Sequence, residues 1–307
     1  MKMKKLTAYL LILALALGCA GALGEEYAPK LAAPAGAPAV AVATLAAANP
    51  EGFTFLEAST IGAEFQKNES DFIIAPVNAG AKLFKAGKST YRLAAVVTWG
   101  NLFLASQRED FSLETLKGTE LVLFGENTVN AAVTLAALKA AGAEPASVRY
   151  LAGAAETQAE LLTNPEAVVV TADPAVTAAK IKNEKVQTIS VQELLKEHAG
   201  MDGFAQAGLF VRKETAEEHP EAVEACLKAV AESAGKAETD PEAVAQAAVA
   251  LEILPNPKVA LAALPGCSIR YVAAADAKAE IEKTASFDLS QFGGEVPGDD
   301  FYFTAQQ

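Results

Sequence analysis

Residues 71–80 read Asp-Phe-Ile-Ile-Ala-Pro-Val-Asn-Ala-Gly, and this stretch decides the fold class. The apolar run Phe72–Ala75 is short and contains β-branched residues, which is typical of a buried strand. Pro76 and Val77 form a turn, and Asn78 is placed to cap a helix that runs to about Ala86. The stretch therefore predicts a strand, a polar turn and a helix in succession.

The same alternation continues on both sides of this stretch. Further strands are predicted at Leu31–Pro34, Phe53–Glu57, Tyr91–Thr98 and Leu102–Ser106. A second block alternates strands and helices from residue 120 to 211, and the chain from about 214 to 287 is mostly helical. Alternation of this kind predicts parallel sheets covered by helices. Two such blocks before a helical tail predict two α/β lobes, with the chain crossing between them.

Composition narrows the classes of protein that this chain can be. It has 307 residues, of which 51% are hydrophobic and 21% charged, so it can bury a substantial core; disordered and fibrous classes are excluded. Lys plus Arg is 25 against 38 for Asp plus Glu, a net charge of −13. Nucleic-acid binding needs a basic face and is not expected. The 2 His and 3 Cys are scattered, so no metal or cofactor is expected.

The first residues have the pattern of an export signal. Met1–Lys5 carries three lysines, and Leu6–Leu17 is almost wholly apolar but too short for a membrane span of ~20 residues. Residues 15–19, Leu-Ala-Leu-Gly-Cys, look like a bacterial lipobox. We therefore expect residues 1–18 to be a lipoprotein signal peptide, Cys19 to be lipidated and residues 19–29 to form a tether. The alternative is ordinary secretion, in which Cys19 is incidental.

Two cysteines remain, Cys226 and Cys267. An extracytoplasmic compartment permits a disulfide between them, but nothing in the sequence demands one. Cys226 lies on an apolar helical stripe with Val223 and Val230, which favours a buried free thiol. Whether the two cysteines pair stays open.

Four stretches resemble the extracytoplasmic solute-binding proteins of ABC importers. The likeness is to the nitrate/sulfonate/taurine-type branch, which also includes binders of thiamine-precursor pyrimidines. The first stretch is residues 71–80. The others are Leu-Lys-Gly-Thr-Glu-Leu-Val-Leu at 116–123, Thr-Ala-Asp-Pro-Ala at 171–175 and Gly-Glu-Val-Pro-Gly-Asp-Asp-Phe-Tyr at 294–302. Their order and spacing extend the resemblance over nearly the whole mature chain.

The resemblance implies an α/β, two-lobed periplasmic-binding-protein fold of type II, with the ligand cleft between the lobes. Lobe 1 would comprise residues 25–105 plus 210–307, and lobe 2 residues 106–209. The hinge would lie at the strands near Leu104–Gln107 and Gln206–Phe210. The implied partners are a small-molecule ligand and the membrane subunits of an ABC importer, with the lipid anchor at the bacterial cell membrane. We expect a monomer.

Ligands of open α/β sheets bind outside the carboxyl ends of the strands. The turns that follow the predicted strands supply the candidate ligand-binding residues, which are Pro34, Ala35, Gly36, Thr60, Asn78, Thr98, Trp99, Asn101, Glu126, Asn127, Thr128 and Asp173. Small residues at 34–36 would let a ligand approach the backbone closely.

Several of these residues also have a purely structural interpretation. Thr60, Asn78, Asn127 or Thr128, and Asp173 all stand where a side chain can cap a helix. Trp99 is the only tryptophan. It is either a stacking wall for a planar ligand or a core aromatic beneath the hinge.

The candidate loops contain no Arg or Lys, whereas Glu126 and Asp173 would repel an anion. This favours a pyrimidine-like or amine-bearing heterocycle over a sulfonate, although Arg92 and Arg108 flank the region. Motifs of hydrolases, zinc proteases and nucleotide-binding loops are missing, and the two histidines lie at expected helix ends. The expected function is transport rather than catalysis. A ligand sensor of the same fold, or an enzyme with Glu126 and Asp173 as an acid/base pair, are the alternatives.

Overall fold

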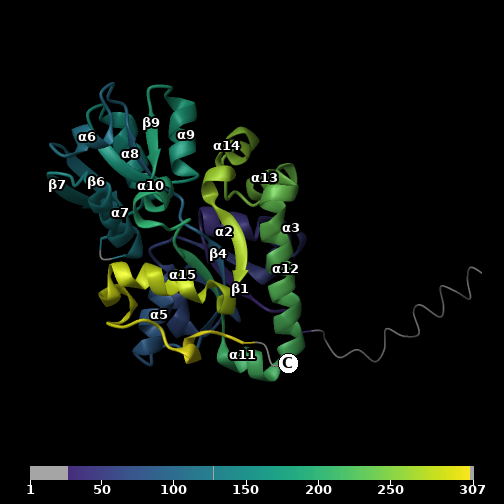
Figure 1. Ribbon diagram of the computed structural model, residues 1–307. Helices are drawn as coiled ribbons and strands as arrows, with labels where there is room; N and C mark the ends of the chain where they lie inside the picture. The colour runs from purple at the N-terminus through teal and green to yellow at the C-terminus, as the bar shows by residue number, and fades with distance from the viewer. Residues whose placement is uncertain (1–26, 127, 305–307) are drawn as a thin grey trace, which may run out of the picture.

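The computed structural model describes residues 27–126 and 128–304. The predicted signal peptide, Cys19 and Asn127 lie outside these residues. The described chain forms two sheets, each covered by helices, side by side (Figure 1). Within it, no helix is long and apolar enough to cross a membrane.

The first sheet has six strands in the order β11-β4-β10-β3-β1-β2. Their bounds are β1 Leu31–Pro34, β2 Phe53–Leu56, β3 Phe72–Pro76, β4 Arg92–Thr98, β10 Ala207–Val211 and β11 Ile269–Ala273. β1 is parallel to β2 and β3, whereas β10 runs antiparallel between β3 and β4. The predicted strand Phe72–Ala75 is thus an inner strand, and its residues are fully buried.

The second sheet has five strands in the order β7-β6-β8-β5-β9. Their bounds are β5 Leu102–Ser106, β6 Glu120–Phe124, β7 Ser147–Leu151, β8 Val168–Ala172 and β9 Gln187–Ser190. β6 is parallel to β7 and β8, and β5 is antiparallel to β8 and β9. The predicted parallel pairing is thus present in both sheets, and each sheet also takes in an antiparallel strand next to a crossing, β10 in the first and β5 in the second.

The helices divide between the two sheets (Figure 1). Those of the first lobe are α2 Ala37–Ala41, α3 Ala43–Ala48, α4 Glu64–Lys67, α5 Val77–Lys85, α11 Lys213–Glu218, α12 Pro220–Thr239, α13 Pro241–Ala250, α14 Pro257–Ala263 and α15 Ala274–Phe287. Those of the second lobe are α6 Leu113–Leu116, α7 Val129–Ala140, α8 Ala154–Thr163, α9 Ala175–Lys182 and α10 Val191–Ala199. Short 3₁₀ turns lie at Pro50–Gly52, Ile61–Ala63, Pro265–Cys267, Leu289–Phe292 and Asp299–Phe301.

The two chain crossings lie a few residues from their predicted places. β5 pairs within the second sheet, with Leu102 opposite Ala172, so the first crossing falls before residue 102 rather than at 105/106. β10 pairs within the first sheet, with Ala207 opposite Pro76, so the return falls before residue 207 rather than at 209/210. β5 belongs to the second sheet and β10 to the first, because each strand buries apolar side chains there. Both lobe boundaries therefore lie a few residues before the predicted positions.

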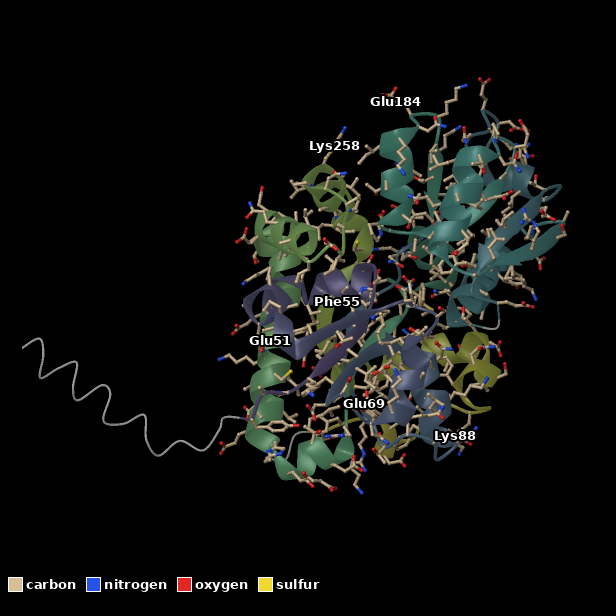
Figure 2. The ribbon with its side chains drawn as sticks, turned by 180° about the vertical axis from the view of Figure 1, so that it is seen from behind. Glu51, Phe55, Glu69, Lys88, Glu184 and Lys258 are labelled. Atoms are coloured by element: carbon tan, nitrogen blue, oxygen red, sulfur yellow. The ribbon has the colours of Figure 1, made fainter. Side chains whose placement is uncertain are left out.

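Helices of the two lobes pack against each other. α14 of the first lobe packs against α9 of the second, and α15 packs against α7. Seen from behind, Lys258 of α14 and Glu184, which follows α9, lie at the same end of the molecule (Figure 2). Because these contacts come from both lobes, they would have to separate for the lobes to open.

A buried carboxylate fixes the start of the described chain to the first lobe. Asp71 accepts hydrogen bonds from the Lys30 backbone N–H (2.8 Å), the Tyr27 hydroxyl, the Thr215 hydroxyl (2.7 Å) and the Arg212 guanidinium (3.0 Å). Burial alone would raise the pKa of Asp71, but these donors together hold it below its ordinary value.

Cys226 and Cys267 are both free thiols. Burial raises the pKa of Cys226 to about 12 and that of Cys267 well above its ordinary value. The predicted free thiol at Cys226 is confirmed, but the residue is half-buried rather than buried.

Candidate ligand-binding site between the lobes

The carboxyl ends of the parallel strands of the first sheet meet at one edge. Because β10 is antiparallel, its first residue, Ala207, lies at this same edge, opposite Pro76 and Thr98. Gln206, just before β10, is held there by its backbone. Its N–H donates to the Thr98 oxygen at 3.1 Å, and its oxygen accepts from the Val77 N–H at 3.0 Å. The return crossing thus adds a side chain to the predicted ligand edge.

The second sheet presents a matching edge. The start of β5 lies beside the end of β8, so Asn101 and Asp173 are neighbours. The Asp173 N–H donates to the Asn101 backbone oxygen at 2.9 Å. The Asn101 side-chain Nδ2 donates to the Asp173 backbone oxygen at 2.7 Å. Asn101 is 4% exposed, and its side chain is fixed by these contacts to the second lobe.

Three amide side chains connect the two lobes. Nε2 of Gln206 donates to Oδ1 of Asn101 at 2.9 Å and to Oδ1 of Asn130 at 3.3 Å. Asn130 belongs to the first turn of α7. We call Asn101, Asn130 and Gln206 the inter-lobe amide cluster. One nitrogen from the return crossing thereby contacts two oxygens of the second lobe.

Asn78 lies next to this cluster but does not cap its helix. α5 begins at Val77 with Pro76 at the N-cap position, so Asn78 falls within the first turn. The capping interpretation was therefore wrong. Asn78 is 6% exposed, and its Oδ1 has no hydrogen-bond partner in the described part of the chain. A buried polar atom without a partner is costly, and this favours the interpretation as a ligand-binding residue.

Asp173 is buried at the end of β8, with 4% of its surface exposed. Its Oδ1 accepts a hydrogen bond from the Thr177 N–H of α9 at 3.2 Å, so the predicted capping role is present. Burial raises the pKa of the Asp173 carboxyl, and the Thr177 contacts and the charge of Lys180 oppose that shift. The carboxylate thus lies at the contact between the lobes and already has one donor.

Trp99 is a buried residue of the first crossing, 5% exposed. Its Nε1 donates to the Arg270 backbone oxygen at 2.9 Å, and the Arg270 guanidinium lies 4.6 Å from the ring centre. The ring thus contacts β11 on one side, which favours the core-aromatic interpretation. Arg270 also brings a cation to the crossing, which the argument from loop composition did not include.

The turn after β1 is partly open to solvent. Pro34 is the buried end of the strand, and the exposed Ala35 donates its N–H to the Leu56 oxygen at 2.8 Å. Gly36 precedes α2 with φ of 100°, a conformation that favours glycine, and a Cβ there would meet nothing within 4 Å. A ligand that approaches the backbone at this turn stays a prediction.

The remaining predicted residues show local contacts. Thr98 is fully buried, and its hydroxyl accepts from the Ala207 N–H. Thr60 is exposed and donates its hydroxyl to the Glu57 oxygen, so it does not cap its helix. Thr128 occupies the N-cap position of α7, but its hydroxyl donates back to the Gly125 oxygen instead of capping. Glu126 is exposed.

The flanking arginines do not join the site. Arg92 opens β4 and so lies at the opposite edge of the sheet, where it lines a cavity of about 300 Å³ with residues of α11 and α12. Arg108 pairs with Asp110 at 2.9 Å. A second cavity, of about 270 Å³, lies between α5 and the chain near residues 292–301. Neither cavity includes a predicted ligand-binding residue.

Sequence reasoning missed Gln206, Asn130 and Arg270. The expectation that ligands bind at the carboxyl ends of strands holds for parallel strands. An antiparallel strand in the same sheet brings its amino end to that edge instead. Gln206 directly precedes a predicted strand, so strand direction was the missing signal. Arg270 is distant in sequence and comes close only through the pairing of β11 with β4.

Two α/β lobes that are joined by short crossings, with polar side chains gathered where the crossings meet, define a two-lobed binding-protein architecture. Residues 92–244 match the family model described as NMT1/THI5 like. The resemblance to the solute-binding proteins of ABC importers is confirmed, as is the two-lobed α/β fold. No curated protein matches the sequence.

Solved structures share the fold at low sequence identity. An ABC transporter from Parabacteroides distasonis is 19% identical, with a TM-score of 0.75 over 92% of this chain and 100% of that one. The periplasmic aliphatic sulphonate binding protein SsuA from Escherichia coli is 14% identical, with a TM-score of 0.67 over 91% and 92%. A DSZB mutant in complex with biphenyl-2-sulfinic acid, 12% identical, has a TM-score of 0.60 over 89% and 95%.

Proposed function

We propose that the protein is a membrane-anchored solute-binding lipoprotein, which captures a small organic molecule between its lobes and delivers it to an ABC importer. The observation that carries the proposal is the inter-lobe amide cluster. The Gln206 side chain of the return crossing contacts Asn101 and Asn130 of the second lobe. A ligand at this position would contact both lobes and stabilise their closure.

The proposed ligand is a pyrimidine-like or amine-bearing heterocycle rather than a sulfonate. Hydrogen-bond acceptors outnumber free donors in the described part of the site. There, Oδ1 of Asn78 has no donor, and the Asp173 carboxylate is buried beside Asn101. The nearest cation that we identify, Arg270, lies over the Trp99 ring. Buried acceptors match ligands that carry N–H groups, whereas an anion would be repelled.

Location follows from the first residues of the sequence. Signal cleavage before Cys19 would leave a lipidated cysteine and a tether to residue 29. The tether would reach the first lobe at Tyr27 and Lys30, which both donate to Asp71. The protein would then be extracytoplasmic and attached to the bacterial cell membrane by lipid.

We propose a transport role without catalysis. The two histidines lie away from the amide cluster: His219 stacks on Tyr27 with 3.7 Å between ring centres, and His198 lies near the end of α10. The buried Asp173 carboxylate is engaged by α9, and Glu126 is exposed. This arrangement offers no nucleophile beside a positioned base in the site.

A thermal-shift screen of the full-length protein in detergent tests the proposal. The panel comprises aminopyrimidines, polyamines, amino acids, nitrate and sulfonates. A ligand at 100 times its Kd adds ~2.7 kcal/mol to the free energy of unfolding. We expect a shift with an aminopyrimidine or amine. A shift with sulfonates alone would contradict the ligand class and keep the binding role, whereas no shift across the panel would count against the binding role.

A further inference from the structure

The orientation of the Gln206 amide is determined by a chain of contacts that ends at a backbone carbonyl. The Asp173 backbone oxygen can only accept a hydrogen bond, so the group facing it at 2.7 Å must be Nδ2 of Asn101. Oδ1 of Asn101 therefore faces Gln206 and can only accept. It follows that the group of Gln206 at 2.9 Å from it is Nε2.

The Gln206 side chain consequently has one occupied end and one vacant end. Its nitrogen donates to both Asn101 and Asn130. Its Oε1 is buried and has no hydrogen-bond partner among residues 27–126 and 128–304. Rotating the amide would bring two oxygens together, so the protein cannot satisfy Oε1 by a flip.

A second unpartnered acceptor lies on the adjoining segment. Oδ1 of Asn78 is likewise buried without a partner in the described chain. Asn78 directly follows Val77, whose N–H donates to the Gln206 backbone oxygen at 3.0 Å. Both acceptors belong to segments that are fixed to the first sheet. The first lobe therefore supplies two amide oxygens for which residues 27–126 and 128–304 provide no donor.

We propose that Gln206 determines ligand specificity, with its Oε1 and Oδ1 of Asn78 accepting hydrogen bonds from N–H groups of the bound molecule. The inference rests on the proposed binding function and assigns the substrate class of the same site. Ligands with a primary amino or amidine group offer the N–H donors that these oxygens lack among the described residues. Fully N-alkylated analogues leave them unpaired, and anions bring negative charge against them. Since Nε2 serves the contact between the lobes, Oε1 remains for recognition.

The test compares 4-aminopyrimidine with 4-(dimethylamino)pyrimidine, whose exocyclic nitrogen has no N–H. Benzamidine and methanesulfonate complete the panel, and calorimetry on the full-length protein in detergent measures each Kd. We expect the dimethylated compound to bind about 10- to 100-fold more weakly, because it leaves buried acceptors unpaired. Gln206→Met removes the acceptor and should reduce this ratio to within about threefold of one.

The matched control is Gln107→Met. Gln107 also makes an amide–amide contact, accepting from Nδ2 of Asn183 at 2.8 Å, but wholly within the second lobe. This variant should preserve the discrimination. A ratio that is unchanged in Gln206→Met, or binding of methanesulfonate without the amino compounds, would overturn the inference and leave the binding function standing. If none of the four probes binds, both the inference and the proposed ligand class are wrong.

Discussion

Gly266 of the first lobe lies directly against the Asp173 carboxylate of the second lobe. A methyl group on Gly266 would overlap Oδ2 of Asp173, and would lie 2.9 Å from its Cγ and 3.3 Å from Cζ of Phe103. Asp173 is 4% exposed and its other oxygen accepts from Thr177, so the carboxylate has little room to move. The absence of a side chain at residue 266 thus permits this contact between the lobes.

Gly266→Ala should hinder lobe closure. The added methyl group has no space unless the lobes separate, so we expect ligand affinity to fall by about tenfold or more. Calorimetry measures the affinity, and small-angle scattering should show a larger radius of gyration. Gly118→Ala is the control, since a Cβ at Gly118 meets nothing within 4 Å. Equal affinities for the two variants would contradict the role of this contact.

Two helical glycines should respond in opposite directions to substitution by alanine. In α5, a Cβ on the buried Gly80 would overlap the Phe210 ring, so Gly80→Ala should destabilise the fold by about 1–3 kcal/mol. In α12, the exposed Gly235 has open space, so Gly235→Ala should stabilise it by up to about 1 kcal/mol. Denaturant unfolding of both variants measures the difference. If both substitutions changed the free energy of unfolding in the same direction, packing around the two glycines would not explain the effects.

Asp71 should make stability depend on pH in the acid range. Because the pKa of Asp71 is held below its ordinary value of 3.8, its contribution is present above that pH and is lost as the pH falls through the lowered pKa. Asp71→Asn should therefore cost about 2 kcal/mol at pH 7, and the loss should shrink below about pH 4. Thermal unfolding between pH 2 and 7 measures this. Asp110→Asn, at an exposed ion pair, should change little.

We expect Trp99 to contribute mainly to the stability of the fold and little to ligand affinity. Trp99→Phe removes the hydrogen bond from Nε1 to the Arg270 oxygen, and we expect a loss of about 1–3 kcal/mol. Ligand affinity should change less than about threefold, because one side of the ring already faces Arg270. Unfolding and calorimetry on the same sample separate the two effects. A large loss of affinity with unchanged stability would restore the stacking-wall interpretation.

The sequence predicted the two lobes, most strands and the edge at which the candidate residues gather. Those features depend on apolar periodicity and on turns, which are local. The chain between β1 and β2 forms two short helices, α2 and α3, which are separated at Val42, and Asn78 falls within its helix rather than at the cap. Such boundaries depend on backbone geometry within one turn. Gln206 and Arg270 enter the site only through strand pairing between distant segments, which no local pattern encodes.

The position of β10 has a consequence for the order in which the chain folds. β10 lies between β3 and β4, although residues 102–199, which contain every strand of the second sheet, come before it in sequence. An emerging chain can complete the second lobe from one continuous segment. The first sheet cannot form completely until residues 207–211 have been synthesised, because β10 lies between β3 and β4. Long-range pairing of this kind is slow, so we expect the two lobes to fold in sequence, the second before the first.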